Sequence, residues 1–246
     1  MSALEIFLYI ILLGFLPPVL WLVFWIREDS SPEPKKEILK VFLAGMAIVV
    51  LAIFLENYFS KTNQYFREVL SYGAFSFQII NLFGFAFIEE ISKMLAAVLT
   101  AFQSKYFDEP VDALVYMVAA AMGFAALENM LFISDSLQAG INQIILVSAF
   151  RFINAILLHA STAILIGAGS AFSYFNHERR LRELAGATAL VILLHTAYNF
   201  FIINNESGFA SFSGIPGQII ATFLVPFGAI VGLVLFEKAR RTNIYS

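Results

Sequence analysis

The chain alternates between long apolar stretches and short polar segments. A bilayer core about 30 Å thick is crossed by about 20 helical residues. Stretches of that length predict seven transmembrane helices, at about residues 4–26, 38–59, 75–102, 111–133, 144–172, 184–203 and 215–236. We interpret residues 60–74 as an interfacial segment, and the pattern leaves room for an eighth helix. The predicted fold is all-α, a polytopic membrane helix bundle that forms a single integral membrane domain over residues 1–246.

Composition supports a membrane protein. Of the 246 residues, 60% are hydrophobic and 13% are charged, whereas soluble domains are about 45–50% apolar and about 25% charged. These values exclude an ordinary soluble enzyme, a disordered tail and a nucleic-acid-binding protein. The absence of cysteine excludes a disulfide framework, a thiolate nucleophile and a metal site with cysteine ligands. We therefore expect the lipid bilayer as a partner and no nucleic acid.

Basic residues are distributed unevenly over the connectors. With the N-terminus outside, the inside connectors carry eleven of them: Arg27, Lys35, Lys36, Lys40, Lys105, Arg179, Arg180, Arg182, Lys238, Arg240 and Arg241. The outside connectors carry two, Lys61 and Arg67. Because Lys and Arg are enriched in cytoplasmic loops, the N-terminus is predicted outside and the C-terminus in the cytoplasm. The expected location is a cell inner membrane or plasma membrane, with multiple passes.

Seven ionisable residues lie inside four consecutive predicted spans. They are Glu89, Glu90, Lys93, Glu128, Arg151, His159 and His195. Ionisable groups inside a bilayer are costly unless they are paired, so they are functional candidates by default. We expect residues 75–203 to form a four-helix catalytic core around one polar cavity. Glu56 and Asp112 lie near span ends and are expected at the membrane interface.

The spacing of these residues suggests roles. Glu89 and Lys93 are four residues apart with the acid first, the favourable order for an ion pair on a helix. Two adjacent carboxylates in a low-dielectric site do not both ionise easily, and a carboxylate of this kind is suited to acid–base catalysis on water. His195 and Asn199 share a helix face and could hold an oxyanion or a water.

Each of these residues also has a possible structural role without catalysis. The Glu89–Lys93 pair could serve only to stabilise its own helix. Asn129 and its neighbour Glu128 could anchor one helix to another by hydrogen bonds. Arg151 could extend to the interface or bridge two helices, and either histidine alone could be a packing residue.

Known protease motifs narrow the catalytic groups. The chain contains no His-Glu-x-x-His zinc motif. It also lacks a Gly-x-Ser-x-Gly motif, and no pair of aspartates lies in the middle of the predicted spans. Glutamate and histidine therefore remain as the candidate catalytic groups.

Four motifs in this region resemble those of a known family. Residues 87–93, Phe-Ile-Glu-Glu-Ile-Ser-Lys, resemble a Glu-Glu-x-x-Lys motif, and residues 123–129, Gly-Phe-Ala-Ala-Leu-Glu-Asn, resemble a Phe-x-x-x-Glu-Asn motif. His159 and the segment His-Thr-Ala-Tyr-Asn at residues 195–199 resemble two histidine motifs. In order, from about residue 83 to residue 200, they resemble the PrsW family of bacterial intramembrane proteases. The candidate catalytic residues are Glu89, Glu90, Glu128, His159 and His195, and the supporting residues are Lys93, Asn129, Arg151 and Asn199.

The PrsW family is similar to a wider superfamily that includes the CAAX-type prenyl proteases. That branch has an arginine one position after the place of Lys93, and a histidine where this chain has Glu128. These departures argue against a prenylated protein as substrate. The superfamily also includes a non-catalytic scaffold subunit of a larger protease complex, so the resemblance in fold does not by itself imply catalysis.

Two catalytic schemes remain open. In the first, which we favour, Glu89 or Glu90 activates a water with the help of a histidine, and no cofactor is needed. In the second, zinc is bound by His159, His195 and either Glu128 or Glu90.

The predicted function is hydrolysis of peptide bonds in single-pass membrane protein substrates. The resemblance implies membrane-anchored regulators such as anti-sigma factors. Two alternatives belong to other classes. A transporter would use the buried polar cluster as a proton or substrate path, and a non-catalytic membrane scaffold would use it to lock helices together.

Overall fold

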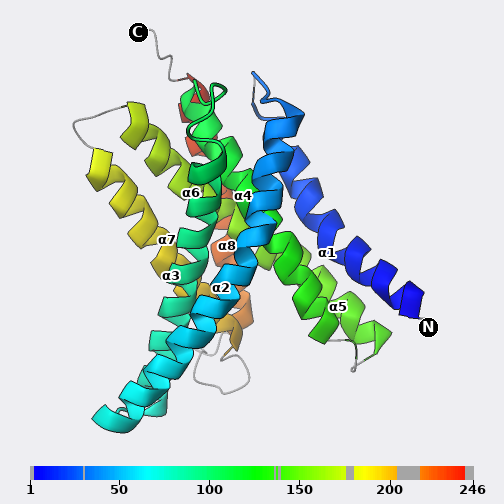
Figure 1. Cartoon of the computed structure of the whole chain (residues 1–246), viewed down its shortest axis with the longest axis vertical. Helices are drawn as coiled ribbons and strands as arrows, with labels where there is room; N and C mark the ends of the chain where they lie inside the picture. The colour runs from blue at the N-terminus through cyan, green and yellow to red at the C-terminus, as the bar shows by residue number, and fades with distance from the viewer. Residues whose placement is uncertain are drawn as a thin grey trace.

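The protein is a bundle of helices. The computed structural model describes residues 3–29, 31–135, 137, 140–175, 180–203 and 217–241, and none of these is in a strand. The helices are α1 (Ala3–Ile26), α2 (Lys35–Leu70), α3 (Ala74–Thr100), α4 (Pro110–Asp135), α5 (Ile141–Ile153), α6 (Ala155–Phe175), α7 (Arg180–Ile203) and α8 (Gly217–Arg241). Helix α1 begins and α8 ends at opposite ends of the bundle (Figure 1). The all-α prediction is confirmed.

Several helices can cross a membrane. Five segments among the described residues are long and apolar enough to do so: Leu4–Ile26, Lys35–Leu70, Pro110–Asp135, Ile144–Ala171 and Arg182–Ile203. These segments support a multi-pass membrane protein. The count of seven spans and the outside position of the N-terminus stay predictions, and the predicted start of the seventh span at residue 215 lies outside the described residues.

Helix α2 is longer than the sequence pattern indicates. It continues from the predicted second span to Leu70, so most of the segment that we interpreted as interfacial is part of this helix. Its 36 residues are about 54 Å long at about 1.5 Å per residue. The Asn63 side chain donates hydrogen bonds to the Phe77 carbonyl (3.1 Å) and to Asn81 Oδ1 (2.9 Å). The extension is therefore held against α3, and the two helices run side by side (Figure 1).

The predicted fifth span is divided into two helices. Helix α5 ends at Ile153 and α6 begins at Ala155, with Asn154 between them. The Asn154 side chain donates a hydrogen bond to the Phe150 carbonyl (3.2 Å), and such a side chain competes with regular backbone bonds. The break places His159 close to the start of α6, and the described residues form eight helices, of which α5 and α6 together make one candidate membrane span.

Helix α4 lies at the centre of the bundle and packs against α1, α2 and α6. Small residues let its backbone approach α2 closely. A Cβ atom added at Gly123 would lie 1.9 Å from the Phe42 carbonyl oxygen, and one added at Gly45 would lie 2.0 Å from the Ala120 oxygen. Such contacts between small residues are typical of helix packing in membranes. The crossing fixes the part of α4 that carries Phe124 and Glu128.

We predict that Gly123→Ala and Gly45→Ala each destabilise the protein by about 1–3 kcal/mol, because an added methyl group overpacks the crossing. The measurement is thermal unfolding of the full chain in lipid nanodiscs. Gly186→Ala is the matched control, since a Cβ there meets nothing within 4 Å, and it should leave stability equal or slightly higher. Unchanged unfolding temperatures for both crossing variants would contradict this packing.

Candidate active site

The adjacent carboxylates of α3 have different surroundings. Glu90 is completely buried. Its Oε1 atom accepts a hydrogen bond from Lys93 Nζ and one from His195 Nδ1, both at 2.6 Å. Glu89 instead lines a cavity. The expected Glu89–Lys93 pair is therefore wrong: Lys93 forms its ion pair with Glu90, three residues earlier on the same helix.

Lys93 also fixes the tautomer of His159. Its Nζ atom lies 3.0 Å from His159 Nδ1 and 5.5 Å from the centre of the Phe124 ring. An ammonium group only donates hydrogen bonds, so Nδ1 must accept and the ring proton of a neutral imidazole must be on Nε2. His159 Nε2 then donates to Glu128 Oε2 at 3.0 Å.

Arg151 joins α5 to α4. It donates one hydrogen bond to Glu128 Oε2 and another to Asn129 Oδ1, and its guanidinium lies 4.0 Å from the centre of the Phe132 ring. Of the two structural roles that the sequence left open for Arg151, bridging two helices is the one observed. Glu128 is thereby held between an arginine and a histidine.

His195 is oriented by Glu90. Because a carboxylate accepts the bond from Nδ1, the proton of the neutral ring is on Nδ1. The opposite nitrogen, Nε2, lies 3.7 Å from Glu89 Oε2. The rings of His159 and His195 meet edge to face, with centres 5.7 Å apart.

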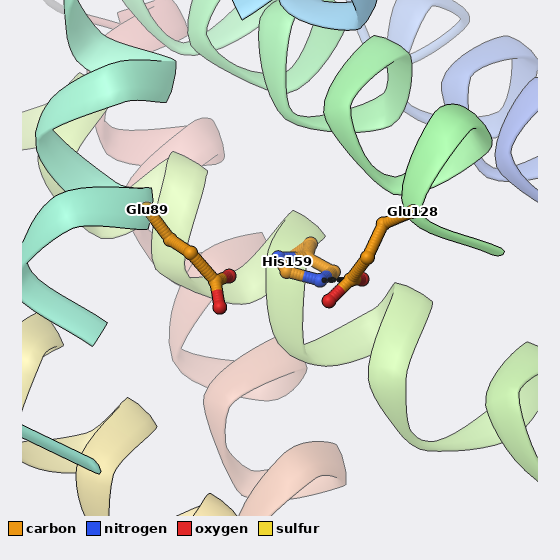
Figure 2. Close-up of side chains that lie close together, drawn as sticks. All are labelled: Glu89, Glu128 and His159. Carbon is orange, nitrogen blue, oxygen red and sulfur yellow. Dashed lines mark hydrogen bonds and ion pairs between the residues drawn. The ribbon is translucent and has the colours of Figure 1, made fainter. Parts of the chain in front are cut away.

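A cavity of about 740 Å³ lies over this cluster, within the usual range of ligand pockets. Glu89, Glu128, His159 and His195 line it, and so do Arg151, Tyr198 and Asn199. Glu90 and Lys93 lie behind this lining. Figure 2 shows the side chains of Glu89, His159 and Glu128 pointing toward one another from three different helices. The structure thus brings all five candidate catalytic residues together.

The cavity includes residues whose part sequence reasoning missed. Glu56 of α2, expected at the interface, lines the cavity. If the sequence had been recognised as one helix that continues past the length of a single span, Glu56 would have been expected away from the end of that helix. Phe124 belongs to a recognised motif, and the structure shows its role: its ring lies beside both Lys93 and His159. Asp112, also expected at the interface, is buried with 1% of its surface exposed.

Comparison with known proteins identifies the family. Residues 33–234 match the family model described as PrsW family intramembrane metalloprotease. The chain belongs to the PrsW family. It is 32% identical over 197 residues to Protease PrsW of Clostridioides difficile, with 76% of each chain covered. It is 28% identical over 232 residues to Protease PrsW of Oceanobacillus iheyensis, with 94% of each covered. No solved structure matches the chain. These relatives show a protease function for this multi-pass membrane protein.

The description of the PrsW family as metalloproteases raises the question of a metal ligand set. One ligand atom each of Glu89, Glu128 and His159 lies within 4.8 Å of the others. Carboxylate oxygens and an imidazole nitrogen suit zinc, and Glu89 Oε2 is buried without a hydrogen-bond partner. This group fits a metal, although it contains Glu89 in place of Glu90 and lacks His195, which was expected in the zinc scheme.

Two contacts argue against His159 and Glu128 as metal ligands and favour a function of these residues that needs no metal. Coordination through His159 Nε2 would move the ring proton to Nδ1, which faces the ammonium of Lys93. Ligand histidines usually donate their second N–H to a carboxylate or carbonyl instead. Glu128, in turn, is already paired with Arg151.

We predict that Lys93→Met lowers the free energy of unfolding by about 3–5 kcal/mol, because it leaves the buried charge of Glu90 with only its hydrogen bond to His195. The double variant Glu90→Gln with Lys93→Met should recover most of this loss. The measurement is thermal unfolding of the purified full chain in detergent.

Lys40→Met is the control for that pair. Lys40 forms an ion pair of the same spacing with Glu37, but its side chain is 51% exposed, so the change should be under about 1 kcal/mol. Equal stability of Lys93→Met and the unaltered chain would refute the buried pair.

Proposed function

We propose that this PrsW-family member is an intramembrane endopeptidase that hydrolyses a peptide bond of a single-pass membrane protein, and that Glu89 is the general base. The observation that carries the proposal is the difference in surroundings between Glu89 and Glu90 on α3. Glu90 Oε1 is bonded to both Lys93 and His195, and Glu90 does not line the cavity, whereas Glu89 lines the cavity and forms no ion pair with Lys93.

A water can contact both Glu89 and His195. Glu89 Oε2 and His195 Nε2 are 3.7 Å apart, which is less than twice the usual hydrogen-bond length of about 2.8 Å. One water oxygen can therefore lie within bonding distance of both. Glu89 takes a proton from this water as the oxygen attacks the substrate carbonyl, and the tetrahedral intermediate forms.

The remaining residues have distinct parts. Asn199, on the cavity wall, offers an amide that can donate to the oxyanion. The proton is then passed through Glu89 or His195 to the leaving amine as the carbon–nitrogen bond breaks. Glu90 and Lys93 are positioning residues, because they hold the imidazoles without lining the cavity. The pair of Glu128 and Arg151 fixes His159 on the other wall.

For the substrate we propose a single-pass protein anchored in the same cell membrane, the inner or plasma membrane. Membrane-anchored regulators such as anti-sigma factors are the substrates that the family resemblance implies. Glu128, His159 and His195 lie on candidate membrane spans, which supports a substrate that presents its peptide bond inside the bundle.

Zinc catalysis is the second candidate, supported by the spacing of Glu89, Glu128 and His159 and by the family description. These three residues would hold the ion. When bound, zinc supplies a Lewis acid and lowers the pKa of a bound water. His195 would then remain oriented by Glu90 toward the same cavity.

We predict that Glu89→Gln lowers cleavage of a single-pass reporter at least about 100-fold, the usual contribution of a general base. Its unfolding temperature should stay within a few degrees of the unaltered chain, because Glu89 forms no ion pair with Lys93. Glu68→Gln, on the exposed end of α2, is the control and should cleave normally. Normal cleavage by Glu89→Gln would refute the assignment. If the unaltered chain is folded but never cleaves the reporter, the scaffold or transporter function would be favoured instead.

Removal of metal separates the two schemes. We predict full reporter cleavage by protein that has been dialysed against a strong chelator and contains less than about 0.05 zinc per chain by elemental analysis. The physical reason is that Glu89 and His195 suffice to activate water. Loss of cleavage that zinc restores would instead establish the metal scheme.

A further inference from the structure

A second group of carboxylates lies at the end of the bundle where the α1–α2 and α3–α4 connectors meet (Figure 1). One carboxylate oxygen each of Glu33, Asp108 and Asp112 lies within 4.8 Å of the others. Asp112 precedes Glu128 on α4 by 16 residues, about 24 Å along the helix. The group is therefore separate from the candidate active site.

Two of these side chains are buried. Asp112 is 1% exposed and Glu33 is 9% exposed. Asp112 Oδ2 accepts hydrogen bonds from the backbone N–H groups of Asp108 (2.8 Å) and Glu109 (2.6 Å). Its other oxygen, Oδ1, is buried and has no hydrogen-bond partner. A buried carboxylate oxygen without a partner is costly, and a ligand at this position would remove that cost.

Asp29 adds a fourth carboxylate on the α1–α2 connector. It is 5% exposed, and its Oδ2 atom also has no hydrogen-bond partner. In the part of the chain that the structure describes, no Lys or Arg forms an ion pair with any of these four acids. Tyr116 donates a hydrogen bond to Glu33, which supplies no positive charge.

The concentration of negative charge is reflected in Glu33. Burial raises the pKa of its carboxyl group, hydrogen bonds with Tyr116 and with the Asp112 carboxyl group oppose this, and the neighbouring charges of Asp29 and Asp108 raise the pKa further. Buried like charges of this kind are stabilised by a shared proton or by a cation.

We propose that Glu33, Asp108 and Asp112 form a binding site for a hard divalent cation. An all-oxygen set of carboxylates selects Ca²⁺, Mg²⁺ or Mn²⁺ over softer metals. Ca²⁺ binds oxygens at about 2.3–2.6 Å, so two of its ligands are at most about 5.2 Å apart, and the three oxygens, all within 4.8 Å of one another, are close enough to share one ion. The ion ties the two connectors to the start of α4 and so stabilises this end of the bundle.

The test measures Mn²⁺ binding to the full chain in detergent by electron paramagnetic resonance. A Glu89→Gln, His159→Ala background removes ligands at the candidate active site. We expect one bound Mn²⁺ per chain, displaced by Ca²⁺. Asp108→Asn should weaken binding about tenfold or more, because it removes one charged ligand. This variant keeps the backbone bonds to Asp112, so its fold is preserved.

Glu109→Gln is the matched control, since Glu109 belongs to the same connector but not to the cluster, and its affinity should be unchanged. Glu33→Gln is the second variant and should weaken binding as Asp108→Asn does. The absence of bound Mn²⁺ up to about 1 mM, the weak end of protein sites for such ions, would overturn the proposal in favour of a shared proton. Equal affinities of Asp108→Asn, Glu33→Gln and Glu109→Gln would also overturn it.

Discussion

The ion pair between Glu90 and Lys93 is the interaction on which the rest of the candidate active site depends. Both side chains are completely buried, so neither charge is tolerable without the other. Each partner has a second contact, Glu90 with His195 on α7 and Lys93 with His159 on α6. The pair therefore connects three helices and sets which nitrogen of each histidine carries a proton. It also leaves Glu89 as the carboxylate that faces the cavity.

The cluster requires a rigid frame, which α4 supplies. Its small residues let α2 approach to backbone contact at Gly45 and Gly123. Phe124 follows directly, and Glu128 comes about one turn later on the same helix. The packing of small residues thus places an aromatic ring beside Lys93 and a carboxylate beside His159. At the other end of α4, Asp112 accepts hydrogen bonds from the backbone of the α3–α4 connector, and Tyr116 donates one to Glu33 of the α1–α2 connector, so both ends of this helix are anchored by polar groups.

The sequence predicts the helical fold and the residues that form the candidate active site, and both predictions have the same physical basis. Charges in a bilayer are costly, so the few that remain in apolar stretches must meet. Their pairing is another matter. Lys93 can reach either Glu89 or Glu90 on the same helix face, and only the positions of His159 and His195 on other helices decide between them. Continuous apolar stretches also conceal the break at Asn154. The sequence also gives no sign that α2 continues past the predicted span end, so the place of Glu56 on the cavity wall was not predicted.

The positions of the protons on the two imidazoles depend directly on the pair of Glu90 and Lys93. Nitrogen NMR of the full chain with ¹⁵N-labelled histidine, in lipid bilayers, resolves Nδ1 from Nε2, and spectra of His159→Gln and His195→Gln assign the signals. We predict a bare Nδ1 and a protonated Nε2 for His159, and a protonated Nδ1 for His195. A His159 ring with its proton on Nδ1 and a bare or metal-bound Nε2 would contradict the role of Lys93 and favour metal catalysis.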